Sequence, residues 1–226
     1  MGLNAKKLPK GNGGPRVEQP ILEPGPYPAR VVQVIDLGLQ PQRPYQGAEK
    51  PPTYMIQLTY ELLDEFMIDE EGNVQEDKPR WVSEEFPFKS LELDQAKSTK
   101  RYYALDPECA LDGDFTQLVG IPCVVTLVHG ENKKDPDRPY MNVGNVSPMR
   151  PKDVAKAPEL VNDPRVFTLD DPNMDVFLSF PQWLQDKIKA NLEYKGSLLE
   201  KRLTGDSSAS EVDPEDVEPE ESDEAW

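Results

Sequence analysis

The 226-residue sequence has little of the residue chemistry on which enzymes and metal centres depend. It contains one histidine, His129, and two cysteines, Cys109 and Cys123, whose spacing fits no metal-ligand motif. It has no glycine-rich phosphate loop, no nucleophile elbow and no HExxH motif. A lone histidine at the end of an apolar stretch rarely acts in catalysis without partners. We therefore expect a protein that is not an enzyme and that carries no cofactor and no metal.

Long apolar segments are also missing from the sequence. No apolar run approaches the length of about 18 residues that a membrane-spanning helix needs, and residues 1–15 lack the apolar region of a signal peptide. Together with two cysteines that need not pair, these absences predict a reducing, soluble, intracellular setting and no membrane partner. Hydrophobic residues make up only 37% of the chain and the mean hydropathy is −0.67, so part of the chain is expected not to pack.

What the sequence does have is an uneven distribution of charge. The net charge is −17, but residues 206–226 alone hold ten acidic and no basic side chains, leaving 32 acidic and 25 basic side chains elsewhere. The first 17 residues hold Lys6, Lys7, Lys10 and Arg16 and no acid. Because local charge steers a ligand, the overall −17 does not exclude a nucleic-acid partner.

The order of expected elements predicts a mainly β fold with some helix. Alternating or β-branched segments indicate strands at residues 30–39, 54–66, 80–88, 123–129 and 140–146, with a helix over 91–105. Three strands, a helix and two strands are the element order of an OB-like, five-stranded Greek-key barrel, with the helix between strands 3 and 4. A C-terminal helix is expected to begin near Pro181 and to reach Leu203; its apolar face could cover the barrel or form a homodimer.

Composition divides the chain into four parts. Residues 1–24 are predicted to be a flexible basic arm, residues 25–150 the OB-like barrel, and residues 151–205 an irregular extension with the C-terminal helix. Residues 206–226 combine prolines, serines and charge of one sign, which predicts a disordered acidic tail.

Several sets of residues fit a single-stranded nucleic acid, which proteins hold by stacking bases on aromatic rings beside a cationic path for phosphates. The candidate DNA-binding residues are Arg43, Tyr45, Lys50, Arg80, Trp81, Lys97, Lys100, Arg101, Tyr102, Lys133, Lys134, Arg138 and Tyr140. A structural role competes with this one, because Trp81 alternates like a core residue and either Tyr102 or Tyr103 has to face inward if the helix packs. Tyr45 is the least ambiguous candidate, since a proline-rich loop is hard to bury.

The tail carries a second candidate site at its last residue. Trp226 is an unfavourable residue to expose in a segment whose only task is solubility. A terminal ring can fill an apolar pocket while the α-carboxylate, Asp223 and Glu224 meet basic side chains around it. The tail is therefore predicted to bind partner proteins.

These parts together resemble a known family. Residues 22–146, with LEPGPYPARVVQVIDLG, FPFKSLELDQAKSTKRYYALDPE and GIPCVVTLVHG, and an acidic tail ending in an aromatic residue are similar to phage-encoded single-stranded DNA-binding proteins. This tail ends in Glu-Ala-Trp, whereas better-known examples end in Asp-Phe or Pro-Phe. The resemblance implies sequence-independent binding of single strands in replication and recombination, in the cytoplasm of the infected host cell. It also implies that the tail recruits polymerase, helicase-primase or nuclease and competes with DNA.

Two other hypotheses fit the sequence. The acidic balance of the body also suits a β-barrel protein-interaction or virion-assembly factor without nucleic-acid binding. The carboxylates of residues 61–71 could be imagined as the metal site of a nuclease, but a solvated strand end and turn explains them better, given the Gly-Asn pair that follows.

Overall fold

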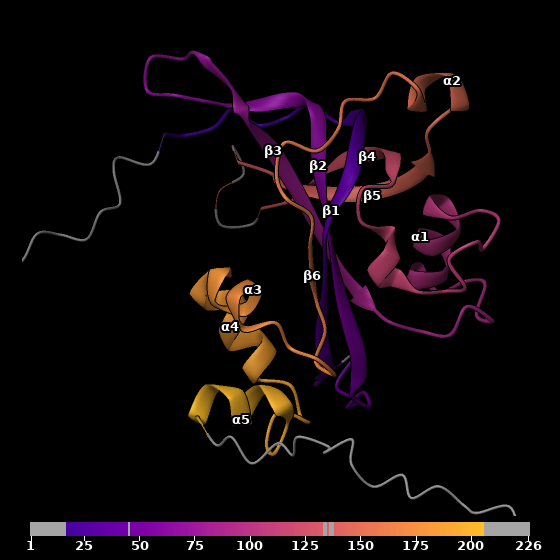
Figure 1. Ribbon diagram of the computed structural model, residues 1–226, viewed down its shortest axis with the longest axis vertical. Coiled ribbons are helices and arrows are strands. Elements are labelled where there is room, and N and C mark those ends of the chain that lie inside the picture. Colours follow the sequence, from indigo (N-terminus) through magenta and orange to yellow (C-terminus); the bar gives the residue numbers. More distant parts are fainter. Residues whose placement is uncertain (1–16, 45, 133–134, 136–137, 206–226) are drawn as a thin grey trace, which may run out of the picture.

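The computed structural model describes residues 17–205 except residues 45, 133–134 and 136–137. Over this part the chain forms six strands, five α-helices and one 3-10 helix (Figure 1). The strands are β1 (Gly25–Gln40), β2 (Thr53–Ile68), β3 (Val74–Pro87), β4 (Pro122–Gly130), β5 (Tyr140–Pro148) and β6 (Arg165–Phe167). The helices are α1 (Lys97–Leu105), η2 (Phe115–Leu118), α2 (Pro151–Val154), α3 (Met174–Ser179), α4 (Gln182–Lys189) and α5 (Leu198–Thr204). The predicted acidic tail lies outside the described residues.

The strands form one sheet in the order β3-β2-β1-β4-β5. The central strand β1 pairs antiparallel with β2 over residues 29–40 and with β4 over residues 25–30, and the short β6 runs parallel to β1 at residues 33–35. The prediction of mainly β structure with some helix is confirmed. Within the described residues the sheet is open, because no ladder joins β3 to β5. The closed five-stranded barrel expected from the sequence is therefore not formed by strand pairing.

The alternation of β2 builds the larger of two cores. Ile56, Leu58, Tyr60 and Leu62 point into it, and each is at most 6% exposed. Side chains two residues apart on a strand share a face, so this grouping follows directly from the sequence. Tyr54 shares the alternation but is 48% exposed, because it lies at the beginning of the strand beyond the packed part.

A register shift in β1 lets the same strand serve a second core. The shift lies between residues 31 and 33. A bulge of one extra residue reverses the direction in which the following side chains point. As a result Val34 faces the larger core, whereas Ile35 and Leu37 point to the opposite side of the sheet and are buried there.

The second core is covered by the C-terminal extension. The extension contributes six buried side chains to this core: Phe167, Phe177, Phe180, Leu184, Ile188 and Leu199. The prediction of one helix from Pro181 to Leu203 is wrong, since α4 ends at Lys189 and α5 begins at Leu198. Between them Gly196 adopts a φ of +83°, outside the right-handed helical region.

The other predicted helix is shorter than the pattern indicated. Residues 91–96 form turns, and α1 begins only at Lys97. Ser98 and Thr99 in its first turn hydrogen-bond to the backbone of Lys89 and Ser90, which fixes the entry of the helix. Serine and threonine favour such local bonds over helix interiors, so the helix starts beside them.

Residues 17–24 pack against the body, although they were expected to belong to the flexible arm. The Gln19 side chain donates to the Ile68 carbonyl at 2.9 Å and accepts from the Ile68 amide at 2.8 Å. Leu22 is 6% exposed and belongs to the larger core. The expected boundary of the arm at residue 24 is corrected by these contacts.

Candidate nucleic-acid interface

The structure separates the thirteen side chains expected to contact DNA into groups. Seven of them are described and exposed, namely Arg43, Lys50, Trp81, Lys97, Lys100, Arg138 and Tyr140. Tyr140 is 53% exposed, and the side chain of Arg138 is 54% exposed and pairs with Glu18 at 2.5 Å. Six predicted residues lie outside the described residues: Tyr45, Lys133 and Lys134 of the DNA set, and Asp223, Glu224 and Trp226 of the tail.

Arg101 joins α1 to the sheet and does not reach the surface. It is 4% exposed and donates to both carboxylate oxygens of Glu84, at 2.7 and 3.1 Å, and to the Gly144 carbonyl at 3.3 Å. Glu84 belongs to β3 and Gly144 to β5, so Arg101 links the two strands that no ladder joins. The expectation that Arg101 contacts DNA is therefore wrong.

The same carboxylate holds two further groups. Lys97 pairs with Glu84 at 2.7 Å, and the Tyr60 hydroxyl donates to it at 2.8 Å. Burial raises the pKa of Tyr60 well above its ordinary value, which keeps the hydroxyl protonated as a donor. Lys97 was expected to contact phosphates, but it is engaged at the mouth of this buried cluster, where the Phe86 ring also faces its ammonium.

The two adjacent tyrosines of α1 have opposite roles. Tyr102 is completely buried, donates to Asp106 at 2.9 Å and accepts from the Gly113 amide at 2.8 Å, so it is a core residue and its expected DNA contact is wrong. Tyr103 is 41% exposed, so of the two adjacent rings it is the one that faces solvent, although only Tyr102 was placed among the candidate DNA contacts. Tyr102 and Leu105 are three residues apart and therefore lie on one face of the helix. That spacing is the signal in the sequence that could have shown which of the two tyrosines faces the core.

Arg80 and Trp81 are held by partners within the chain. Arg80 donates to the Pro20 carbonyl at 2.7 Å, and partial burial lowers its pKa. The Trp81 indole donates to Glu61 at 3.1 Å, and the Arg165 guanidinium lies 5.9 Å from the centre of its ring. Trp81 remains 36% exposed, and its polar edge and one face are engaged by the chain's own side chains.

The residues around Trp81 are covered by the segment 157–167, which we call the strap. Glu61 on β2 is 1% exposed and accepts from the amides of Val161 and Asn162, from the Asn162 side chain and from Trp81. Arg30 on β1 donates to the carbonyls of residues 157 and 158. Further along the chain, Lys187 of α4 pairs with Glu85 of β3. The strap and α4 thus cover part of the outer face of β1, β2 and β3.

Replacing Glu61 with alanine should free the strap. Four donors then lose a charged acceptor, and because hydrogen bonds to charged groups are worth about 1.5–3 kcal/mol, we expect the free energy of unfolding to fall by about 2–3 kcal/mol. Hydrogen exchange should show faster exchange at the amides of Val161 and Asn162. Glu159→Ala is the matched control: Glu159 also pairs with Arg30, at 3.2 Å, but its side chain is 88% exposed, so the loss should stay below about 1 kcal/mol. Equal losses in both variants would contradict this role of Glu61.

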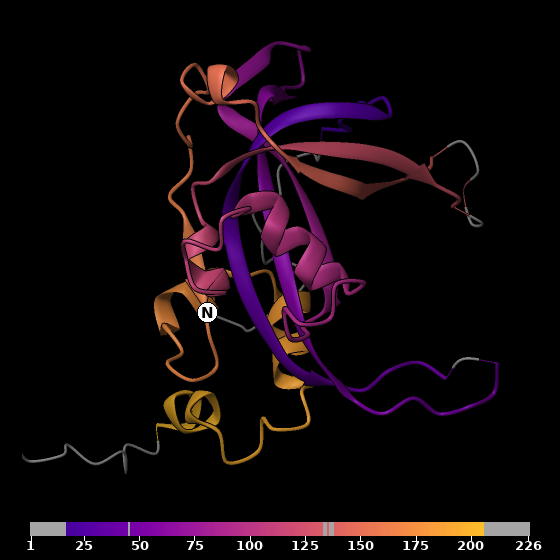
Figure 2. The same ribbon diagram turned by 90° about the vertical axis from the view of Figure 1, so that its right-hand side faces the viewer.

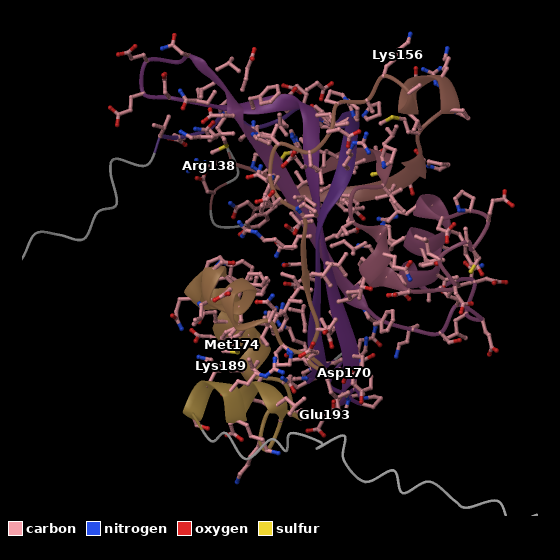
Figure 3. All side chains as sticks on the ribbon, in the orientation of Figure 1. Arg138, Lys156, Asp170, Met174, Lys189 and Glu193 are labelled. Atoms are coloured by element: carbon pink, nitrogen blue, oxygen red, sulfur yellow. The ribbon has the colours of Figure 1, made fainter. Side chains whose placement is uncertain are left out.

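Five of the exposed candidates, together with Tyr103, belong to the β1–β2 loop, to α1, or to β5 and the loop before it. Figure 2 shows the β1–β2 loop and the β4–β5 hairpin projecting to the same side of the body, whereas Figures 1 and 3 show α1 and Arg138 on opposite sides of β1 and β2. We use the name loop face for this set of residues: Arg43, Lys50, Lys100, Tyr103, Arg138 and Tyr140. Its charge is mixed, because Glu49, Glu131 and Asp135 lie in the same loops. Among the described residues, the loop face thus combines exposed cations of the predicted set with the half-exposed rings of Tyr103 and Tyr140, contributed by three separate elements.

Compared with known proteins, the chain matches no protein-family model, no curated protein and no solved structure. Over the described residues, no group of three or more His, Cys, Asp or Glu side chains is placed to hold a metal ion. None of the helices in the same part of the chain has the length and apolar character needed to cross a membrane. Function has to follow from the chain's own residues and their geometry.

Proposed function

We propose that this protein binds single-stranded DNA without sequence preference during phage DNA replication and recombination. The observation that carries the proposal is the exposure of the loop-face residues, whose rings Tyr103 and Tyr140 are 41% and 53% exposed in elements that also present exposed cations. Rings stack on any base and cations pair with any phosphate, so such a surface is tolerant of sequence.

We further propose that the body is an OB-like barrel closed through α1. The strand order β3-β2-β1-β4-β5 and the helix between β3 and β4 match that fold, and its ligand-binding loops are those that follow strands 1 and 4. The usual closure between strands 3 and 5 is replaced here by the side-chain bridge from Glu84 through Arg101 to Gly144.

The strap changes where a DNA strand would run. In an OB-fold the outer face of strands 2 and 3 also contributes to binding. In this protein that face is occupied at Glu61 by the strap and at Glu85 by Lys187. The proposed path therefore crosses the loops and α1 rather than the middle of the sheet.

The acidic tail is proposed to serve two purposes. Its ten carboxylates would compete with DNA for the cations of the loop face, because a tethered segment has a high effective concentration. Asp223, Glu224 and Trp226 would recruit polymerase, helicase-primase or nuclease through a basic apolar pocket on those partners.

Removing the two exposed rings tests the DNA-binding proposal. We expect Tyr103→Ala and Tyr140→Ala each to weaken binding of fluorescein-labelled oligo-dT by about 5- to 150-fold, since a stacked base is worth about 1–3 kcal/mol. Fluorescence anisotropy with the full chain measures the affinity, and a duplex of the same length should bind more weakly. Because both rings are about half exposed, thermal stability should be unchanged.

Trp183→Ala provides the matched control for these variants. Trp183 is 57% exposed but belongs to α4 in the extension, away from the loop face. Its removal should leave oligo-dT affinity within twofold of the unmodified chain. If all three variants bind alike, the loop face is not the DNA-binding surface.

A β-barrel protein-interaction or virion-assembly factor is the second candidate function. The covered outer face of β2 and β3 favours it, since the strap occupies a surface that OB-fold proteins use for nucleic acid. The same titration separates the two candidates: absence of any binding to labelled single strands at low salt would favour the protein-interaction role.

A further inference from the structure

A cavity of about 540 Å³ lies where the sheet meets the C-terminal extension, on a part of the surface that the proposed DNA-binding role does not use. Residues of β1 and β2 form one wall, and the segment 168–170 that follows β6 forms another. Residues 113–116, which lead into and begin η2, also line it, together with Phe88, Phe167 and Glu193. Its volume is within the range of about 300–1,000 Å³ that is typical of sites for small ligands.

Aromatic rings make up much of the apolar lining. Phe115 and Phe167 are buried beneath the cavity, whereas Tyr54 and Phe88 are 48% and 43% exposed at its edge. Phe88 and Tyr54 are held together by a backbone hydrogen bond of 2.8 Å from the Phe88 amide, and the Phe88 ring stacks edge-on against Phe115 at 5.2 Å. Two large rings are thus fixed in place with their outer faces open.

Carboxylates surround these rings. Asp36, Asp114, Asp170 and Glu193 all line the cavity, and none of its lining residues is a lysine, arginine or histidine. The Tyr54 hydroxyl donates a hydrogen bond of 2.9 Å to the Glu193 carboxylate. Figure 3 shows Glu193 and Asp170 close together at the lower end of the sheet. Burial raises the pKa of Asp36, as expected for a carboxylate that a cation does not neutralise.

We infer that this cavity binds an arginine or lysine side chain from a basic segment of a partner protein. A cation over the face of Tyr54 or Phe88 gains a cation–π interaction, and Asp170 and Glu193 can accept charge-assisted hydrogen bonds from it. A phosphate-bearing ligand is disfavoured because every charged group in the lining is negative. A metal ion is disfavoured because no described group of three acidic, histidine or cysteine side chains is arranged to ligate one.

The inference does not depend on DNA binding. It concerns a different set of residues, whose charged groups are all negative, so the protein could bind both ligands at once. The net charge of −17 would in addition steer a basic partner toward the molecule.

The test uses the ¹⁵N-labelled full chain titrated with the peptide acetyl-Gly-Arg-Arg-Gly-amide and followed by two-dimensional NMR. The amide signals of Gly38, Phe88 and Leu169 should shift, because these residues line the cavity. In the double variant Asp170→Asn/Glu193→Gln the dissociation constant read from those signals should rise at least tenfold. The control Glu70→Gln/Glu71→Gln also removes two negative charges, but at the tip of the β2–β3 hairpin. It should change the dissociation constant less than twofold.

Three outcomes would overturn the inference. Peptide-induced shifts confined to the signals of residues 206–226 would mean that the peptide binds the acidic tail alone. Equal weakening of binding in the two double variants would reduce the effect to net charge. Finally, shifts of the cavity signals on addition of oligo-dT of eight nucleotides would make the cavity a base-binding site instead.

Discussion

Replacing Arg101 with methionine is expected to lower the free energy of unfolding by about 3 kcal/mol. Removing one partner of a buried ion pair costs about 3–5 kcal/mol, and both side chains here are at most 5% exposed. The loss should fall at the lower end of that range, because Lys97 stays 2.7 Å from Glu84 and compensates part of its charge. Urea unfolding measured by circular dichroism gives the value.

Two further variants decide whether the buried charge is the cause. Lys100→Met removes an exposed cation from the neighbouring position and should cost less than about 0.5 kcal/mol. In R101M/E84Q the unpaired charge is gone as well, so part of the lost stability should return. If R101M cost less than 1 kcal/mol, α1 would not be closing the gap between β3 and β5 in the way the geometry indicates.

Deleting residues 206–226 is expected to tighten binding to oligo-dT about tenfold at low salt. The deletion removes ten negative charges that are tethered to the body and compete with phosphates for the same cations. The difference should shrink as salt is raised, because the Debye length falls to about 8 Å at physiological ionic strength. Fluorescence anisotropy at several salt concentrations checks both expectations.

Two tail variants separate charge from the terminal ring. Removing Trp226 alone should leave oligo-dT affinity unchanged while reducing capture of a replication partner by the immobilised chain. Replacing the ten tail acids by Asn and Gln should reproduce the effect of the deletion on DNA binding. A tail deletion that bound oligo-dT no better, or less well, would rule out competition between tail and DNA.

Much of the fold follows from local sequence patterns. The alternation of residues 54–62 placed Ile56, Leu58 and Tyr60 in the core, and the five long strands lie close to where β-branched and alternating segments predicted them. Strand periodicity is a strong signal because one face of each strand is buried. The short β6 was not predicted, since three residues are too few to carry a period.

The candidate site was harder to predict because the same side chains suit a surface and a core. An arginine and a tyrosine next to each other in α1 looked like a phosphate and base contact, yet Arg101 and Tyr102 are buried. Their partners Glu84 and Asp106 are 17 and 4 residues away, and only packing brings Glu84 to Arg101. Buried polar groups need such partners, and sequence alone does not name them.

The sequence by itself determined the strand order along the chain, the inward face of β2 and the separation of charge between the body and its last 21 residues. These properties depend on short-range periodicity and composition, which are visible without coordinates. Only the tertiary structure decided that the extension covers part of the sheet, that α1 bridges β3 and β5, and which cations stay exposed. Those outcomes depend on contacts such as Glu61 with Val161, separated by 100 residues, and on the register shift in β1 that turns Ile35 into the second core.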